Sequence, residues 1–381
     1  NFNEGRKEGG ETNEIQTSPL ISLPLGDLGR IPRDILKIIF SCVGSKHMGK
    51  VRQLSKAWYQ LTTGYEVPGI VGVAHKPQDN MLISGLGINK RVVDFRKVRG
   101  LSPEHILSFP WYQLVGEVKD LPQCFWPYIA GTQVHTLHLR KNRIDAEGAK
   151  ELSAALTNTR IHTLNLGYNE IGAKGAKELA TALPSTHVHT LMLGEIDDEG
   201  AKELAAALPN THVHTLDLGW NQIGAKGAKE LAAALPSTQV HTLNLGWNQI
   251  GNEGAKELAA ALPSTQVHTL HLQYNQIGDE GAKELARALP STQVHTLYLG
   301  SNQIGNEGAK ELAADLPSTQ VHTLDLYINQ IGDEGAKELV KTLPSTQVHT
   351  LYLQGNQISD EMQKLFRQLL RQENSNITFY F

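Results

Sequence analysis

Histidine is the residue type whose spacing suggests chemistry most strongly. It recurs nine times at one constant interval, which is shortened in a single step. The positions are His135, His162, His189, His214, His241, His268, His295, His322 and His349. Imidazole is a common metal ligand and titrates near neutral pH. On adjacent parallel strands such side chains would lie about 4.8 Å apart in a row. A linear row does not converge as a tetrahedral zinc site requires, so we predict a repeated structural residue, with no metal and no cofactor.

A second candidate is a phosphate-binding loop. Gly44, Gly49 and Lys50 have the spacing G-x-x-x-x-G-K. However, Val51 stands where a Ser or Thr would hold magnesium, and no acidic partner strand follows. The sequence also contains neither H-E-x-x-H nor G-x-S-x-G. We therefore predict that the chain is not an enzyme.

Charge and cysteine content narrow the class of partner. The net charge of -4 lacks the basic excess of a nucleic-acid or anionic-membrane binder, and no transmembrane run occurs, so protein partners are expected. Cys42 lies in an apolar stripe and Cys124 beside two aromatic residues, which predicts buried, inert thiols. An enzyme with its own cysteine-based ligase chemistry is thereby disfavoured. Two cysteines without a disulfide framework fit a reducing compartment and predict a cytoplasmic location.

The histidines belong to a longer repeat that fixes the architecture. Leu137 and Leu139 alternate as in a strand, whereas Ala176, Leu179 and Leu183 have helical spacing. Each unit is therefore a strand followed by a helix, and can bury its apolar faces only against neighbouring units. We predict an α/β solenoid of nine repeats over residues 134–360, with parallel strands on the concave side and helices on the convex side.

The repeat has the pattern V-x-x-L-x-L-x-x-N-x-I, for example Val240, Leu243, Leu245, Asn248 and Ile250. This pattern resembles the leucine-rich repeat, and its long helical half resembles the ribonuclease-inhibitor subtype. The resemblance implies that the asparagine turns inward and hydrogen-bonds the backbone of the turn. The third copy, MLGEIDDEGAKEL, lacks two residues including this asparagine, and we expect a kink or a solvated gap there.

Residues 31–63 differ in character from the repeats. They contain I-P-x-D-I-L-x-x-I-F followed by V-R-x-L-S-K-x-W-Y-x-L, two apolar helical stripes behind a Pro-Asp helix start. This segment resembles the F-box, which implies a small all-helical domain that docks onto a Skp-type adaptor of a cullin-RING ubiquitin ligase. The residues expected to face the adaptor are Ile31, Pro32, Ile35, Leu36, Ile39, Phe40, Val51, Leu54 and Trp58. The alternative is a helical cap that binds no partner.

The remaining segments complete a domain map. We predict a disordered lead (1–20), the F-box-like domain (25–64), a linker (65–90), two degenerate capping repeats (91–133), the nine repeats (134–360) and a C-terminal cap (361–381). In the degenerate repeats Val93 and Val115 precede Leu137 at two equal intervals. The closing ITFYF alternates apolar residues and predicts a final strand.

Positions that vary between copies are the candidates for recognition. They lie in the strand between the two leucines and just beyond it, where exposed aromatic residues are typical of binding hot spots. The residues predicted to bind a protein substrate are Asp217, Trp220, Trp247, His271, Tyr274, Tyr298, Asp325, Tyr327 and Tyr352. We expect the aromatic ones to form one slanting strip. The alternative is that Trp220, Trp247 and Tyr274 pack against one another and bind nothing.

Both halves together resemble an F-box and leucine-rich-repeat protein. The resemblance implies a substrate receptor of a ubiquitin ligase that carries no catalytic residue of its own. The GAKELA phrase also resembles the GALA-type repeats of effectors that bacterial pathogens deliver into eukaryotic cells, which would place the protein in the host cytoplasm. The alternative function is a non-catalytic scaffold or inhibitor. The identity of the substrate does not follow from the sequence.

Overall fold

The computed structural model describes residues 92–94, 113–115, 134–372 and 377–381. The chain divides into two units, Asn1–Gly87 and Ile88–Phe381, and all described residues belong to the second. The predicted lead, F-box-like domain and linker therefore lie outside the described residues. So do the predicted adaptor-facing residues, which are Ile31, Pro32, Ile35, Leu36, Ile39, Phe40, Val51, Leu54 and Trp58.

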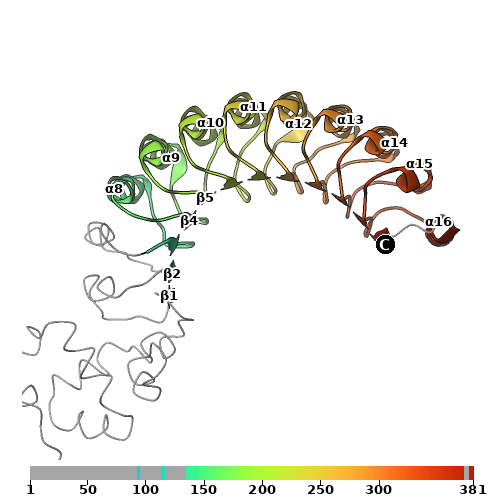
Figure 1. The fold of residues 1–381 in the computed structure, drawn as a ribbon, viewed down its shortest axis with the longest axis horizontal. Helices are drawn as coiled ribbons and strands as arrows, with labels where there is room; N and C mark the ends of the chain where they lie inside the picture. Colours follow the sequence, from blue (N-terminus) through green and yellow to red (C-terminus); the bar gives the residue numbers. More distant parts are fainter. Residues whose placement is uncertain (1–91, 95–112, 116–133, 373–376) are drawn as a thin grey trace, which may run out of the picture. The chain divides into compact units, whose positions relative to one another are not determined.

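The described strands form one parallel sheet of 12 strands in chain order. They are β1 (Val92–Asp94), β2 (Gln113–Val115), β3 (Thr136–His138), β4 (Thr163–Leu166), β5 (Thr190–Leu193), β6 (Thr215–Asp217), β7 (Thr242–Asn244), β8 (Thr269–His271), β9 (Thr296–Tyr298), β10 (Thr323–Asp325), β11 (Thr350–Tyr352) and β12 (Thr378–Tyr380). From β3 onward the repeats follow an arc with the strands on its inner side and the helices on its outer side (Figure 1). This arrangement confirms the predicted solenoid.

Each strand from β3 to β11 is followed by a helix whose apolar stripe faces the sheet. The helices are α8 (Ala146–Leu156), α9 (Gly172–Ala182), α10 (Asp198–Ala207), α11 (Ala225–Ala234), α12 (Gly251–Ala261), α13 (Asp279–Ala288), α14 (Asn306–Asp315), α15 (Asp333–Thr342) and α16 (Asp360–Gln372). From α9 to α15 a Leu-Pro-Ser or Leu-Pro-Asn turn of 3₁₀ helix follows, because proline cannot continue the α-helical hydrogen bonding.

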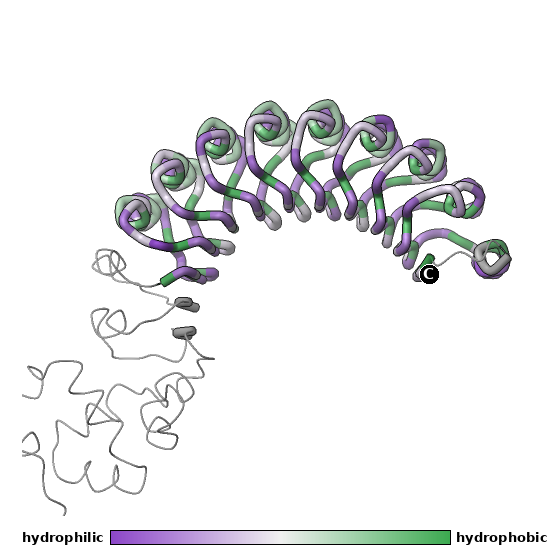
Figure 2. Tube along the Cα trace, in the orientation of Figure 1, coloured by the Kyte–Doolittle hydropathy of each residue, from purple (hydrophilic) through white to green (hydrophobic). Residues whose placement is uncertain are grey.

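The core lies between the helices and the strands and repeats with the sequence. In the sixth repeat, for example, Leu270, Leu272, Ala282 and Leu285 have no solvent exposure. Figure 2 shows hydrophobic residues recurring at equivalent places in successive repeats. Because every repeat buries its apolar faces against the next one, the stability of each repeat depends on its neighbours.

The first strands show where the expected spacing fails. β1 and β2 pair in parallel ahead of β3, with Val93 opposite Leu114 and Leu114 opposite Leu137. The equal intervals between Val93, Val115 and Leu137 therefore do not mark one row across the sheet, since Val115 pairs with His138. The two connections differ in length, so equivalent positions do not recur at a constant interval.

The last strand was predicted from the alternation in ITFYF and is confirmed. β12 pairs in parallel with β11, with Phe379 opposite Leu351. Phe366 of α16 is fully buried, with its ring centroid 5.7 Å from Phe379 and 5.1 Å from Phe381. Large aromatic side chains thus fill the C-terminal end of the core, whereas the helices of the repeats contribute small alanine side chains.

The repeated asparagine is buried and links neighbouring repeats, as the leucine-rich-repeat resemblance implies. Asn275 has no solvent exposure. Its Nδ2 donates to the carbonyls of Leu245 at 2.7 Å and Leu272 at 3.2 Å, and its Oδ1 accepts from Ile250 N at 3.2 Å. The amide therefore satisfies backbone groups of two repeats that water does not reach.

The third repeat lacks this asparagine, yet the expected solvated gap is absent from the described array. β5 pairs with both β4 and β6, and Leu193 and Ile196 are buried. Asn221 of the next repeat donates to Leu193 O at 3.0 Å and accepts from Ile196 N at 2.7 Å. The shortened turn remains packed because the following repeat supplies these hydrogen bonds.

The start of several helices is capped by the preceding repeat. Asp279 Oδ1 accepts from Gly305 N at 2.6 Å and from Gly308 N at 2.8 Å. A Cβ on Gly308 would lie only 2.7 Å from that oxygen, so the close approach requires glycine. Asp198, Asn252 and Asn306 serve the next repeat in the same way.

Where alanine replaces this capping residue, the next glycine changes conformation. Ala146 precedes Gly172 by one repeat and Ala225 precedes Gly251, and these glycines have φ of 58° and 61°. The glycines that receive a cap are extended, for example Gly305 with φ of -99°. The residue type at the capping position of one repeat thus correlates with the backbone conformation of the glycine in the next repeat.

Candidate protein-binding surface

The variable strand residues lie on the inner side of the arc. In each of the three-residue strands β6 to β11 the central leucine is buried and its neighbours are half-buried, so the latter point away from the core. Asn244 Nδ2 donates to Asp217 Oδ1 at 2.9 Å. The rings of His271 and Tyr298 stack with centroids 4.3 Å apart. These residues form a continuous polar and aromatic row, which we call the strand row.

Partial burial shifts the pKa values of several side chains in the strand row. Burial raises the pKa of Asp325 above its ordinary value, although the Tyr327 backbone hydrogen bond opposes this. Burial also lowers the pKa of His271, with the charge of Asp217 acting in the opposite direction. The pKa of Tyr298 is raised by burial first and then by Tyr352 and Asp325. A partially desolvated carboxylate gains more from a cationic partner than a solvated one does.

A second row lies in the turns just after the strands. It consists of Tyr168, Trp220, Trp247, Tyr274 and Tyr327, which we call the aromatic ladder. The first four have left-handed φ between 55° and 61°. Trp220 and Trp247 stack with centroids 3.8 Å apart, and Trp247 and Tyr274 at 3.5 Å. Tyr327 Oη donates to Tyr274 Oη at 2.8 Å.

The predicted single strip is therefore two rows, one of strand residues and one of turn residues. The stacking that was predicted as an alternative to binding does occur within the aromatic ladder. It nevertheless leaves 53% of Trp220 and 38% of Tyr168 exposed. Exposed aromatic area of this size is costly in water and is available to a partner.

The aromatic ladder is interrupted at the third repeat. The Tyr168 and Trp220 centroids are 6.2 Å apart with the rings tilted by 41°. Glu195, with φ of 57°, occupies the corresponding turn position between them in the sequence. On the N-terminal side, Arg140 Cζ lies 4.3 Å from the Tyr168 ring centroid, a cation–π contact.

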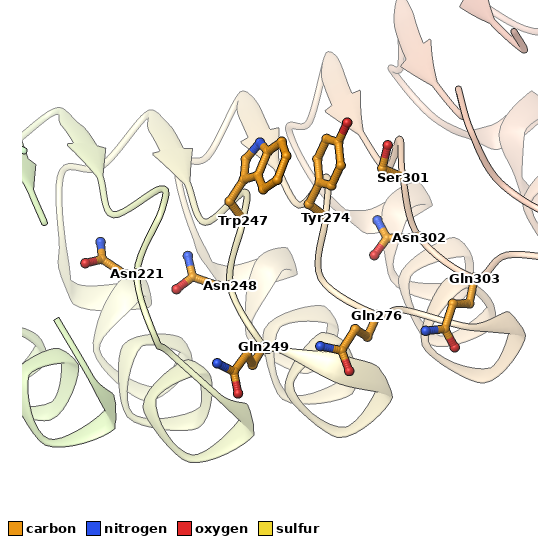
Figure 3. A pocket seen from close by; sticks show the side chains of 9 residues that line it. All are labelled: Asn221, Trp247, Asn248, Gln249, Tyr274, Gln276, Ser301, Asn302 and Gln303. Atoms are coloured by element: carbon orange, nitrogen blue, oxygen red, sulfur yellow. The ribbon is translucent and has the colours of Figure 1, made fainter. Parts of the chain in front are cut away.

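A pocket of about 430 Å³ adjoins the aromatic ladder. Its lining consists of Asn221, Trp247, Asn248, Gln249, Tyr274, Gln276, Ser301, Asn302 and Gln303. Figure 3 shows Trp247 and Tyr274 side by side, with the three glutamines in a row nearer the helices. The pocket thus offers amide donors and acceptors next to aromatic edges, a combination suited to a polar segment of a protein.

Two families match this chain. The F-box domain profile matches residues 28–67, which include all nine predicted adaptor-facing positions. The leucine-rich-repeat profile matches residues 132–153, 157–180, 210–232, 237–259, 264–286, 291–313 and 318–340. The chain is an F-box and leucine-rich-repeat protein. F-box domains and leucine-rich repeats are typically non-catalytic interaction modules.

Solved structures similar to this F-box and leucine-rich-repeat protein include an internalin from Listeria monocytogenes, with 19% identity, TM-score 0.44, and coverage of 76% of this chain and 85% of that one. LegL7, a leucine-rich-repeat-containing protein from Legionella pneumophila, has 21% identity, TM-score 0.41, and coverage of 73% and 97%. The actin-binding site 2 of leiomodin-1 has 20% identity, TM-score 0.34, and coverage of 39% and 89%. No curated protein matches the chain.

Sequence reasoning overlooked part of this surface. Ser301 and the pocket glutamines Gln249, Gln276 and Gln303 were not expected, although the glutamines recur in the turns at the same interval as the repeats. Tyr380 was also missed; it is 43% exposed and stacks on Tyr352 at 4.8 Å. The repeat spacing indicates the glutamine row, whereas Tyr380 lies beyond the last repeat and carries no periodic signal.

The histidines form a row of neighbouring rings. Successive centroids are 5.0 to 5.4 Å apart. The pKa of His162 is lowered by burial first and then by His135, His189 and His187. Within the described ranges no group of three or more His, Cys, Asp or Glu side chains could hold a metal ion. In those same ranges, none of the helices combines the length and apolarity needed to cross a membrane.

Proposed function

We propose that this protein is the substrate-recognition subunit of a Skp-cullin-F-box type ubiquitin ligase. The observation that carries the proposal is the F-box match over residues 28–67 in a chain whose remainder is a leucine-rich-repeat array. The F-box segment binds a Skp-type adaptor through Ile31, Pro32 and Ile35, together with Leu36, Ile39, Phe40, Val51, Leu54 and Trp58. The array holds a protein substrate.

The substrate side of the proposal rests on the two rows. Trp220 and Tyr168 present exposed aromatic area, and Asp217 and Asp325 lie in the neighbouring strand row. Substrate binding would engage Asp217, Trp220, Trp247, His271, Tyr274, Tyr298, Asp325, Tyr327 and Tyr352. Aromatic side chains in such positions commonly contribute about 2 kcal/mol or more each to a protein–protein interface.

In this role the protein supplies no catalytic group, because ubiquitin transfer takes place on other subunits. It would act in the cytoplasm, or in the host cytoplasm if it is a bacterial effector with GALA-type repeats. The rigid stacking of the repeats would hold the substrate at a fixed distance from the adaptor.

Co-purification with a Skp-type adaptor tests the proposal. The full chain, co-expressed with the adaptor, is expected to elute as a stable complex at micromolar concentration. A variant with Ile35→Ala, Leu36→Ala and Phe40→Ala should lose the complex while its repeat array unfolds at the same denaturant concentration. If the well-folded wild-type chain forms no complex, it is a leucine-rich-repeat scaffold or inhibitor instead.

A further inference from the structure

We propose that the interruption of the aromatic ladder between Tyr168 and Trp220 binds an arginine side chain of a basic segment in the partner protein. The proposal deepens the proposed function by naming the chemistry of the substrate, and it rests on that function. Four observations support it: the geometry of the two rings, the residue that replaces the missing aromatic one, the cation–π contact that Tyr168 already makes, and the charge of the neighbouring surface.

The geometry fits a planar group. The ring centroids of Tyr168 and Trp220 are 6.2 Å apart, whereas those of the directly stacked pair Trp247 and Tyr274 are 3.5 Å apart. The wider separation is only slightly less than two such stacking distances. The rings are tilted by 41°, so they are not stacked face to face, and they must move apart to admit a group between them. Both side chains are exposed, and a small rotation would admit a planar guanidinium between them.

The residue at the interruption is acidic. Glu195 has the same left-handed backbone as Tyr168 and Trp220, so it takes the turn position that carries an aromatic ring in the flanking repeats. Its side chain is exposed. A carboxylate at the turn position between two repeats that carry aromatic rings matches a guanidinium, which stacks through its face and donates hydrogen bonds through its edge.

The protein already binds a guanidinium at this ladder. Arg140 Cζ lies 4.3 Å from the ring centroid of Tyr168, in the repeat on the side away from Trp220, and Lys141 Nζ of the same repeat lies 5.8 Å from that centroid. Among the described residues, the repeats on the Trp220 side provide no such cation. The internal contact shows that the Tyr168 ring accepts a planar cation in this setting.

Arg140 and Lys141 lie on the N-terminal side of Tyr168, but from the third repeat onward the strand-and-turn surface is complementary to a basic segment. Between residues 188 and 359 the strands and the turns that follow them contain no Lys or Arg, because the cations of these repeats lie on the helices. The same segments contain Glu195, Asp217 and Asp325. Complementary charge of this kind favours a cationic partner and disfavours an acidic one.

Peptide binding by the purified full chain tests the proposal. The probes are a labelled peptide of alternating Arg and Gly and a matched peptide of alternating Lys and Gly, measured by fluorescence anisotropy at physiological ionic strength. The arginine peptide is expected to bind about tenfold more tightly than the lysine peptide. Trp220→Ala and Glu195→Gln should each weaken binding of the arginine peptide by about five- to tenfold.

Two matched variants separate this site from general electrostatics. Glu170→Gln removes an equivalent exposed charge in the adjacent repeat, and Ile328→Ala removes an exposed apolar side chain at the same turn position in the eighth repeat. Both should leave binding of the arginine peptide within about twofold of wild type. Glu195→Tyr would place a ring in the interruption and should abolish the preference for arginine without lowering the melting temperature.

Equal affinity for both peptides, or equal losses in Glu195→Gln and Glu170→Gln, would overturn the proposal. Retained preference for arginine in Glu195→Tyr would also overturn it. The adaptor complex is measured on the same preparations. A protein that binds the adaptor but shows no arginine preference is still a receptor with a different substrate chemistry, whereas loss of the adaptor complex alone contradicts the proposed function.

Discussion

The outer helical side and the inner strand-and-turn side of the array use charge in opposite ways. On the helices Lys150 pairs with Glu147 at 3.1 Å and Lys202 with Glu199 at 3.0 Å, and all four side chains are more than half exposed. Such pairs contribute little to stability. On the inner side Asp325 is half-buried and has a raised pKa. This carboxylate is partly desolvated and can select a partner.

The comparison indicates which positions are constrained by stacking and which are free for recognition. The buried leucines and asparagines make the contacts that hold one repeat against the next, and they are nearly constant between copies. The strand row and the aromatic ladder differ between copies and leave part of their surface exposed. Substitutions should therefore separate into those that lower stability and those that lower binding.

The largest loss of stability is expected for Asn275→Ala. The change removes the donor to Leu245 O and Leu272 O and the acceptor for Ile250 N, all in buried surroundings. The free energy of unfolding should fall by about 3 kcal/mol, measured by urea denaturation. Gln330→Ala, at an exposed turn position, is the control and should change it by less than about 0.5 kcal/mol.

A smaller loss is expected for Asp279→Ala, which removes the cap that Gly305 N and Gly308 N receive from the preceding repeat. The expected cost is about 1 kcal/mol in the same denaturation measurement. Asp279→Asn should be nearly neutral, because Asn252 and Asn306 make the same hydrogen bonds in other repeats. A comparable loss in both variants would show that charge, and not capping, is what matters at this position.

The smallest effect concerns pH and the histidine row. The folded pKa of His162 lies below its ordinary value of 6.5, so on acidification the unfolded chain takes up the proton first and stability falls. Melting temperature should therefore drop between about pH 7 and about pH 5. Replacing His135, His162 and His189 by Gln should flatten this dependence. An unchanged slope would mean that these imidazoles are too solvated to contribute.

The contribution of the Asp333 carboxylate to stability can be distinguished from that of the histidines by the pH range in which each group titrates. Hydrogen bonds from the backbone and side chain of Ser359 lower the pKa of Asp333 below its ordinary value of 3.8. The contribution of Asp333 to stability is therefore present above that value and is lost only in stronger acid. Asp333 therefore does not contribute to the change between about pH 7 and about pH 5.

The sequence predicted the fold well because the repeat period reports stacking directly. The strand and helix of each unit follow from apolar spacing that the copies repeat, the buried asparagine follows from the leucine-rich-repeat resemblance, and the final strand follows from the alternation in ITFYF. The prediction from sequence failed where the repeat period changes. The equal intervals between Val93, Val115 and Leu137 do not mark aligned positions in the sheet. A gap was expected at the third repeat, because the sequence does not show that Asn221 can hydrogen-bond the backbone of the shortened turn.

The candidate site was predicted in part. The residues that vary between copies were identified, but their division into a strand row and an aromatic ladder was not. Tyr298 lies in a strand, whereas Trp247 lies in a turn with left-handed φ, and the two positions differ by only a few residues in the repeat. The interruption at Glu195 requires side-chain geometry from two repeats at once, which periodicity alone does not provide.

Whether the stacked rings of the aromatic ladder bind the substrate is tested by comparing wild type with the double variant Trp247→Ala, Tyr274→Ala. We would measure three quantities for each variant: affinity for the protein substrate bound by the repeat array, affinity for the adaptor, and melting temperature. Ile328→Ala is the control. We predict that substrate affinity falls at least about thirtyfold while adaptor affinity and melting temperature stay nearly unchanged. A variant that unfolds several degrees earlier and still binds its substrate would contradict the account, and would show that the stacked rings only stabilise the array.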